Sequence, residues 1–161
     1  MSKRLIVYYS LSGNTKKAAE YLAEKTGAEL MRLVCVKDVS ESSGARFLVG
    51  GMKALKNDRP ELMSFDKYPG AYDEIIIGTP VWAGVNAPAL NTFLSGDGIK
   101  EKITAVFTLS GGGDNDRCVE KLKKLIPGIR YTAALTDERG KNAGENTARL
   151  DRLAREVLSG K

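Results

Sequence analysis

The sequence contains no histidine, and its 161 residues include only two cysteines, Cys35 and Cys118. The absence of histidine excludes triads that depend on an imidazole and most zinc arrangements, so we expect no metal centre. The two cysteines form no C-x-x-C pair and fall in different expected elements. We therefore expect free thiols in a reducing compartment, and the cytoplasm is the expected location.

Long apolar runs are also missing, since no stretch approaches the ~20 residues that cross a membrane. The apolar stretch near the N-terminus lacks a cleavage-site pattern, so we expect no signal peptide. The net charge is +5, yet basic residues are interspersed with acids and form no stripe interleaved with aromatics. We therefore expect neither a membrane nor a nucleic acid as a partner.

Two common nucleotide-binding fingerprints are absent. No G-x-x-x-x-G-K-[ST] motif occurs, because Gly13-Asn14-Thr15-Lys16 lacks that spacing, and no G-x-G-x-x-G follows the first apolar run. These absences argue against a P-loop nucleotide hydrolase and against a dinucleotide-binding dehydrogenase.

A strand, a short polar turn and a helix start are present at residues 4–17. Leu5–Tyr9 is an unbroken apolar run typical of a strand buried on both faces, and apolar residues recur at helical spacing from Ala18 onward. The turn Ser10–Thr15 carries hydroxyls, an amide and a glycine. Free N–H groups at a helix N-terminus bind anions, so we predict a phosphate loop here. The alternative is that Ser12, Asn14 or Thr15 only caps the helix.

Apolar runs and helical spacings alternate five times along the chain. The predicted strands are Leu5–Tyr9, Ala28–Val36, Tyr72–Gly78, Ile103–Leu109 and Ile129–Leu135, and Pro80 is expected to end the third. This alternation predicts an α/β fold: a five-stranded parallel sheet with helices on both faces, for which 2-1-3-4-5 is a common strand order. We expect a single domain over residues 1–161, without an internal repeat.

In that strand order, ligands bind beyond the carboxyl ends of the strands, between the first and third strands. The loops that follow the first, third and fourth strands meet there. They are Ser10–Thr15, Thr79–Val85 and Ser110–Asn115. The sequence thus brings a phosphate loop, an aromatic loop and a glycine-rich loop to one edge of the sheet.

The motif S-x-S-G-N-T in the first of these loops resembles the phosphate loop of the flavodoxins, which hold flavin mononucleotide (FMN). The stretch Gly78–Gly84 resembles that family's second flavin loop, and the resemblance runs from Lys3 to about Leu158. It implies a flavodoxin-like three-layer sandwich with FMN as cofactor and no catalytic side chain. The residues that it implies as FMN-binding are Ser10, Ser12, Gly13, Asn14, Thr15, Thr79, Pro80, Val81, Trp82, Ala83, Gly84, Asn86, Ser110, Gly111, Gly112, Gly113 and Asp114.

Three parts of this set have a structural alternative. Trp82 either stacks on a flavin ring or packs its loop onto the core. The Asn86 side chain either hydrogen-bonds to a polar edge of the flavin ring or only begins the helix, just before Pro88. Gly111–Gly113 either lets the backbone approach a ligand or forms a flexible turn. A second aromatic residue, which a flavodoxin would often place near Ser110–Arg117, is absent there, which would leave one ring face open to a substrate.

Three functions follow from these features. The first is an FMN-binding electron carrier that shuttles electrons between redox proteins, and the basic charge favours an acidic partner. The second is an FMN-dependent NAD(P)H:quinone-type oxidoreductase on the same fold. The third is a flavodoxin-like binding module without flavin.

Overall fold

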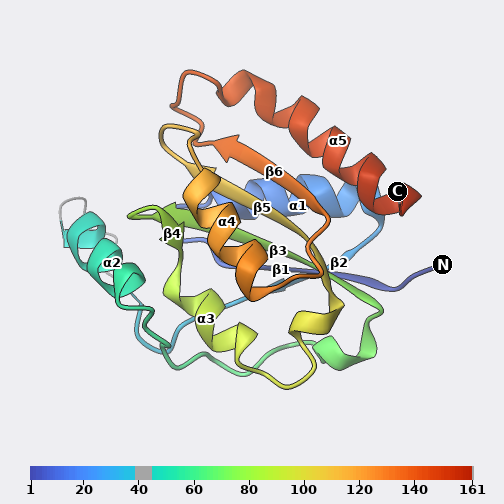
Figure 1. The fold of residues 1–161 in the computed structure, drawn as a ribbon, viewed down its shortest axis with the longest axis horizontal. Coiled ribbons are helices and arrows are strands. Elements are labelled where there is room, and N and C mark those ends of the chain that lie inside the picture. The colour runs from blue at the N-terminus through green and yellow to red at the C-terminus, as the bar shows by residue number, and fades with distance from the viewer. Residues whose placement is uncertain (39–44, 161) are drawn as a thin grey trace.

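A computed structural model of the chain describes residues 1–38 and 45–160, with the side chains of 45–49 left out (Figure 1). Its five parallel strands are β1 (Arg4–Tyr8), β2 (Glu29–Arg32), β3 (Glu74–Trp82), β5 (Ile103–Ser110) and β6 (Tyr131–Thr136). They lie in the order β2-β1-β3-β5-β6, and the short β4 (Val85–Asn86) pairs antiparallel with the end of β3. The predicted sheet and strand order are confirmed.

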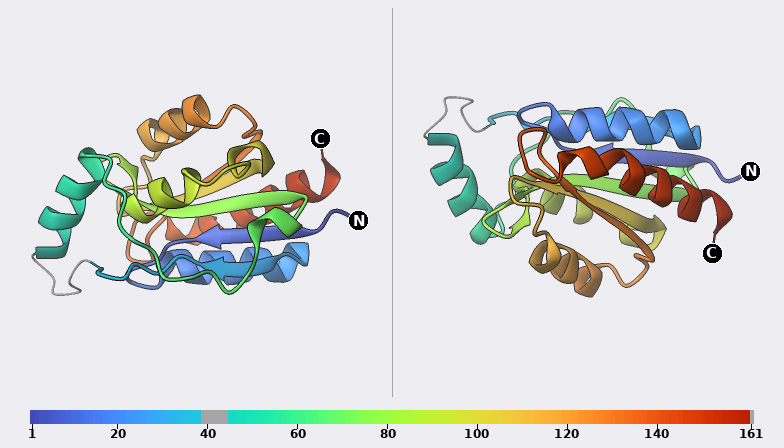
Figure 2. Two further views of the ribbon diagram at one scale, coloured as in Figure 1. Left: turned by 90° about the horizontal axis from the view of Figure 1, so that it is seen from below. Right: turned by 90° about the horizontal axis from the view of Figure 1, so that it is seen from above.

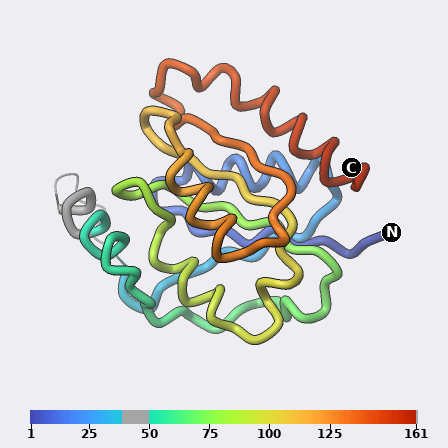
Figure 3. Tube along the Cα trace, in the orientation of Figure 1, coloured from blue at the N-terminus to red at the C-terminus, as the bar shows by residue number. Residues whose placement is uncertain are grey.

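Helices cover both faces of the sheet. The helices are α1 (Asn14–Thr26), α2 (Ala45–Leu55), α3 (Pro88–Leu94), α4 (Asp116–Leu125) and α5 (Asn146–Ser159), and single 3₁₀ turns span Pro69–Ala71, Lys100–Lys102 and Ala143–Glu145. α1 and α5 lie side by side on one face, and α3 and α4 cover the other (Figure 2). α2 lies beyond the carboxyl ends of the strands, on the opposite side of the molecule from both termini (Figure 3).

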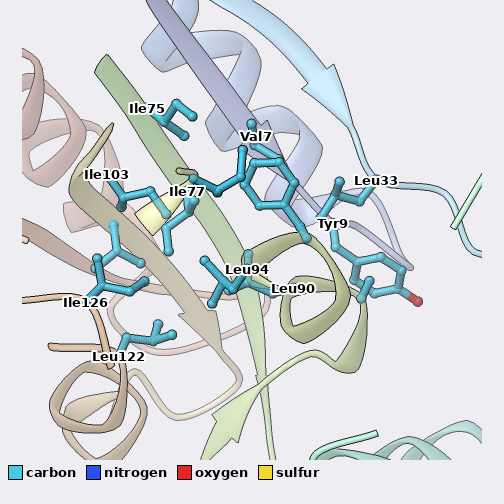
Figure 4. Packing of buried hydrophobic residues seen from close by; sticks show 14 of the residues in the cluster. Val7, Tyr9, Leu33, Ile75, Ile77, Leu90, Leu94, Ile103, Leu122 and Ile126 are labelled. Carbon is cyan, nitrogen blue, oxygen red and sulfur yellow. The ribbon is translucent and has the colours of Figure 1, made fainter. Parts of the chain in front are cut away.

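The core follows from the period-two alternation of buried strands. In β1, Leu5 and Val7 face the α3/α4 layer, whereas Ile6 and Tyr8 face the α1/α5 layer, and all four are buried. The core between the sheet and the α3/α4 layer is completed by leucines and isoleucines of β3, α3 and α4 (Figure 4). The central strands β1, β3 and β5 are thus buried on both faces over most of their length, and the loops that follow them emerge at one edge of the sheet.

Two predicted strand boundaries are wrong. β3 continues through Pro80 to Trp82, and β2 ends at Arg32, although Cys35 still makes an isolated bridge with Leu62. The carbonyl of Gly78 accepts a hydrogen bond from the N–H of Tyr9, just after β1 ends. Pro80, two residues on, faces the same side and lies past the last β1–β3 pair, Tyr8–Gly78, so its missing N–H falls at the end of this ladder and not inside it.

Candidate functional site

The loop after β1 is built around the buried hydroxyl of Ser10. Its Oγ accepts hydrogen bonds from the backbone N–H groups of Gly13 and Lys16, at 3.1 and 3.2 Å. The guanidinium of Arg32 on β2 donates to the Ser10 carbonyl at 2.8 Å, which ties the loop to the neighbouring strand. Gly13 has φ of 99° and provides no side-chain cap for α1. The first-turn N–H groups of Asn14 and Thr15 have no acceptor within the helix.

A cavity of about 710 Å³ opens at the carboxyl edge of the sheet. Four loops form its wall, those after β1, β3, β5 and β6, together with Gly51 of α2. The predicted site residues in this wall are Ser12, Asn14, Thr15, Pro80, Val81, Trp82, Ala83, Ser110 and Gly111. The structure thus brings together the three loops that the sequence singled out.

The aromatic side of the cavity is a tight hairpin between β3 and β4. Trp82 pairs with Val85, and the two turn residues Ala83 and Gly84 both have positive φ, 52° and 80°. This is the backbone of a two-residue hairpin turn, which Gly84 adopts without strain. The Trp82 ring meets the ring of Tyr9 edge-on at 5.5 Å, and a Cβ on Gly50 of α2 would lie 3.2 Å from it. Trp82 therefore packs its loop onto neighbouring elements and also lines the cavity.

The glycine-rich loop after β5 is tied to the loop after β6. The Ser110 hydroxyl accepts from the N–H of Gly113 at 2.8 Å, and the Ser110 carbonyl accepts from the N–H of Asp137 at 2.9 Å. A Cβ on Gly140 would lie 2.0 Å from Cγ2 of Thr136 and 2.9 Å from the Gly111 carbonyl oxygen. Only glycine lets the two loops approach this closely.

The loop after β6 is a part of the wall that was not predicted from the sequence. Asp137, Glu138, Arg139 and Gly140 all line the cavity. The predicted strand order could have indicated this loop, because it places the last strand beside the fourth, with its carboxyl end at the same edge. Leu11, Gly51 and Leu109 also line the cavity without having been predicted.

The remaining predicted residues do not line the cavity. The Thr79 hydroxyl donates to the Pro80 carbonyl and accepts from the N–H of Ala87, and the Asn86 amide donates to Ala87 and Asn91. Asn86 is the last residue of β4, two residues before α3 begins at Pro88, and its side chain ties β4 to Ala87 and to Asn91 of α3. Apart from these two, the residues outside the lining are Ser10, Gly13, Gly84, Gly112, Gly113 and Asp114.

The charges around the cavity are mixed. Lys17 of α1 forms an exposed ion pair with Glu138 at 2.5 Å, which links α1 to the loop after β6. The exposed Arg139 also lines the cavity, and burial raises the pKa of the half-buried Asp137 above its ordinary value. Among the described residues, no group of three or more acidic or thiol side chains is arranged to hold a metal ion.

Comparison with known proteins agrees with this geometry. Residues 3–142 match the family model described as flavodoxin. The chain belongs to the flavodoxin family. The family and fold that the sequence motifs predicted are thereby confirmed.

Individual relatives are similar over most of their length. A protein from Archaeoglobus fulgidus named NAD(P)H dehydrogenase (quinone) is 30% identical over 141 residues, which cover 79% of this chain and 71% of the relative. A flavoprotein from Lactobacillus acidophilus, solved in complex with FMN, is 26% identical, with 92% and 99% of the two chains covered and a TM-score of 0.67. A protein assigned as a flavoprotein, from Bacteroides eggerthii, is 29% identical, with 96% and 99% covered and a TM-score of 0.72.

No described helix of this flavodoxin has both the length and the apolar character needed to cross a membrane.

Proposed function

We propose that the chain binds FMN in the cavity at the carboxyl edge of the sheet and transfers electrons through it. The observation that carries this proposal is the convergence of four loops on one cavity, with the first turn of α1 in its wall. A cavity of about 710 Å³ is within the size range of cofactor pockets. Membership of the flavodoxin family and the FMN complex of the Lactobacillus relative support FMN as the ligand.

The loop residues fit the two ends of such a molecule. Ser12, Asn14 and Thr15, with the N–H groups that open α1, provide donors for a phosphate. Pro80–Ala83 and Ser110–Gly111 provide the flat apolar and backbone surfaces suited to a planar ring. We propose these residues as the FMN contacts. When bound, FMN supplies the electron chemistry, and the protein contributes binding, orientation and the local electric field.

The preferred role is that of an electron carrier between redox proteins. Electron transfer through FMN needs no acid–base side chain, because the flavin itself supplies the chemistry. The net charge of +5 favours a partner with an acidic docking surface.

The second candidate is an FMN-dependent NAD(P)H:quinone oxidoreductase. The name of the Archaeoglobus relative favours it, as do the exposed rim residues Ser12, Ala83 and Gly111, which leave the cavity accessible to a small acceptor. Steady oxidation of NAD(P)H by a quinone, without any partner protein, would select this candidate. Absence of turnover in an FMN-loaded sample would select the carrier.

The binding proposal is tested by comparing FMN with riboflavin, which lacks the phosphate. We expect FMN to bind at least ~100-fold more tightly in absorbance titrations, because charge-assisted hydrogen bonds to the phosphate are lost with riboflavin. Thr15→Val should weaken FMN binding by roughly tenfold and leave riboflavin binding unchanged. Thr147→Val, at an exposed position in α5, is the matched control. Equal affinities for FMN and riboflavin would contradict the phosphate site, and no binding of either would leave the flavin-free module.

A further inference from the structure

A second pocket lies on the other side of Trp82. Its volume is about 200 Å³, and it shares only Trp82 with the wall of the larger cavity. The end of β1, the start of α3, and the segments at 35–38 and 53–60 form the rest of its lining. Nothing in the proposed FMN site uses these segments.

Hydrogen bonds hold the walls of this pocket in place. The carbonyls of Asp58 and Pro60 accept from the side chains of Asn91 and Thr92 on α3, at 3.0 and 2.6 Å. The phenol of Tyr9 donates to Asp38 at 2.5 Å. Because the segment 58–60 is fixed to a helix, the pocket does not depend on a free loop.

Part of the pocket lining is aromatic and aliphatic. Tyr9 and Trp82 contribute aromatic rings, and Pro60, Pro88 and Ala89 contribute aliphatic surface. Flat aromatic walls favour planar ligands. An apolar cavity of about 150 Å³ accommodates a benzene molecule, so this pocket has room for one ring with a substituent.

The rim of the pocket carries an excess of positive charge. Lys37, Lys53 and Arg59 line it against the carboxylates of Asp38 and Asp58. Burial and the hydrogen bond to Asp38 raise the pKa of Tyr9, so its phenol stays protonated and continues to donate to that carboxylate. Burial, with the nearby Asp38 charge, raises the pKa of Cys35 to about 11, so the thiol adds no negative charge at neutral pH.

We propose that this second pocket binds a small planar carboxylate, of the class of single-ring aromatic acids, at a site separate from the FMN cavity. The ring would lie among Tyr9, Trp82 and the prolines, and the carboxylate would face Lys53 and Arg59. Charge-assisted hydrogen bonds from these cations would distinguish an acid from its neutral amide.

The test uses benzoate as the probe and benzamide as its uncharged analogue. The full chain, labelled with ¹⁵N and saturated with FMN, gives one indole N–H resonance because Trp82 is its only tryptophan. We expect benzoate to shift this resonance saturably and to bind roughly tenfold more tightly than benzamide. The double variant Lys53→Gln/Arg59→Gln should weaken benzoate binding by roughly tenfold. Lys124→Gln, an exposed cation of α4, should leave it unchanged.

Several results would overturn the proposal. They are a benzoate shift that disappears when FMN saturates the protein, weakening by Arg139→Gln at the rim of the larger cavity, equal binding of benzamide, or no binding at all. The same titration without FMN measures benzoate binding even if the protein fails to bind flavin, so this inference can fail or succeed independently of the proposed function.

Discussion

At the residue scale, the half-buried acid that lines the cavity is Asp137, whereas the predicted Asp114 is exposed and lies outside the lining. Burial disfavours the charged carboxylate and raises its pKa above 3.8. Asp137 is thus a group whose ionisation opposes folding at neutral pH.

We expect Asp137→Asn to raise the thermal midpoint of unfolding at pH 7. The pKa of Asp137 is raised in the folded state, so its contribution to stability is complete below about pH 3.8 and is lost as pH rises through the folded pKa. The variant's advantage should therefore shrink as the solution is acidified towards pH 3.8. Calorimetry across this pH range measures the effect, with Asp114→Asn as the matched exposed control. If the thermal midpoints of the two variants depended on pH in the same way, the raised pKa of Asp137 would be refuted.

Gly140 illustrates why part of the site escaped prediction. A glycine within a polar stretch is typical of any turn, so its presence alone did not indicate a residue of the site. The need for it arises from Thr136 and from the Gly111 carbonyl, which belongs to another loop. Only the folded arrangement brings that carbonyl within 2.9 Å of where a Cβ would stand.

At the scale of elements, three strands are joined at the end of the sheet opposite the cavity. Arg4 of β1 pairs with the buried Glu74 of β3 at 2.7 Å, and the hydroxyl of Thr104 of β5 donates to the same carboxylate. Arg4 and Glu74 are also direct neighbours in the β1–β3 register. Buried charges of this kind are stabilising only while each keeps its partner.

Glu74→Gln is expected to lower the free energy of unfolding by about 2 kcal/mol, because it leaves the Arg4 guanidinium without its carboxylate. Denaturant titration measures the change. FMN affinity should stay the same, since the pair lies at the far end of the strands from the cavity. Glu101→Gln, at an exposed position, is the control. A loss smaller than that of the control would mean that the pair contributes nothing.

Element boundaries were harder to predict than the elements themselves. Apolar runs located all five parallel strands, because burial on both faces demands such runs. The extension of β3 through Pro80 was missed, because the cost of a proline depends on which neighbour its missing N–H would have faced. That neighbour is known only once β1 is seen to end at Tyr8.

At the scale of the whole molecule, the sequence predicted the family, the sheet order and the position of the larger cavity. The sheet order and the position of the cavity follow from regular alternation and from the rules of parallel sheets, whereas the family follows from the motifs that resemble flavodoxin loops. The second pocket was not predictable in this way, since Tyr9, Cys35, Lys53, Trp82 and Pro88 come from separate parts of the chain. No local pattern indicates a surface that five segments assemble.

FMN should stabilise the whole chain. At a free concentration 100 times its dissociation constant, a ligand that binds only the folded state adds about 2.7 kcal/mol. For a chain of 161 residues this corresponds to a rise of about 5–10 °C in the thermal midpoint. Differential scanning calorimetry with and without FMN measures it. An unchanged midpoint at that concentration would contradict FMN binding to the folded state.

Trp82 lines both pockets, so any coupling between the two binding equilibria must be reciprocal. If a molecule in the smaller pocket shifts the indole and changes the affinity for FMN by some factor, FMN must change the affinity for that molecule by the same factor. The sign of this coupling depends on whether the two occupants favour the same position of one ring against Tyr9 and Gly50. The Trp82 side chain would then couple FMN binding in the larger cavity to ligand binding in the smaller pocket.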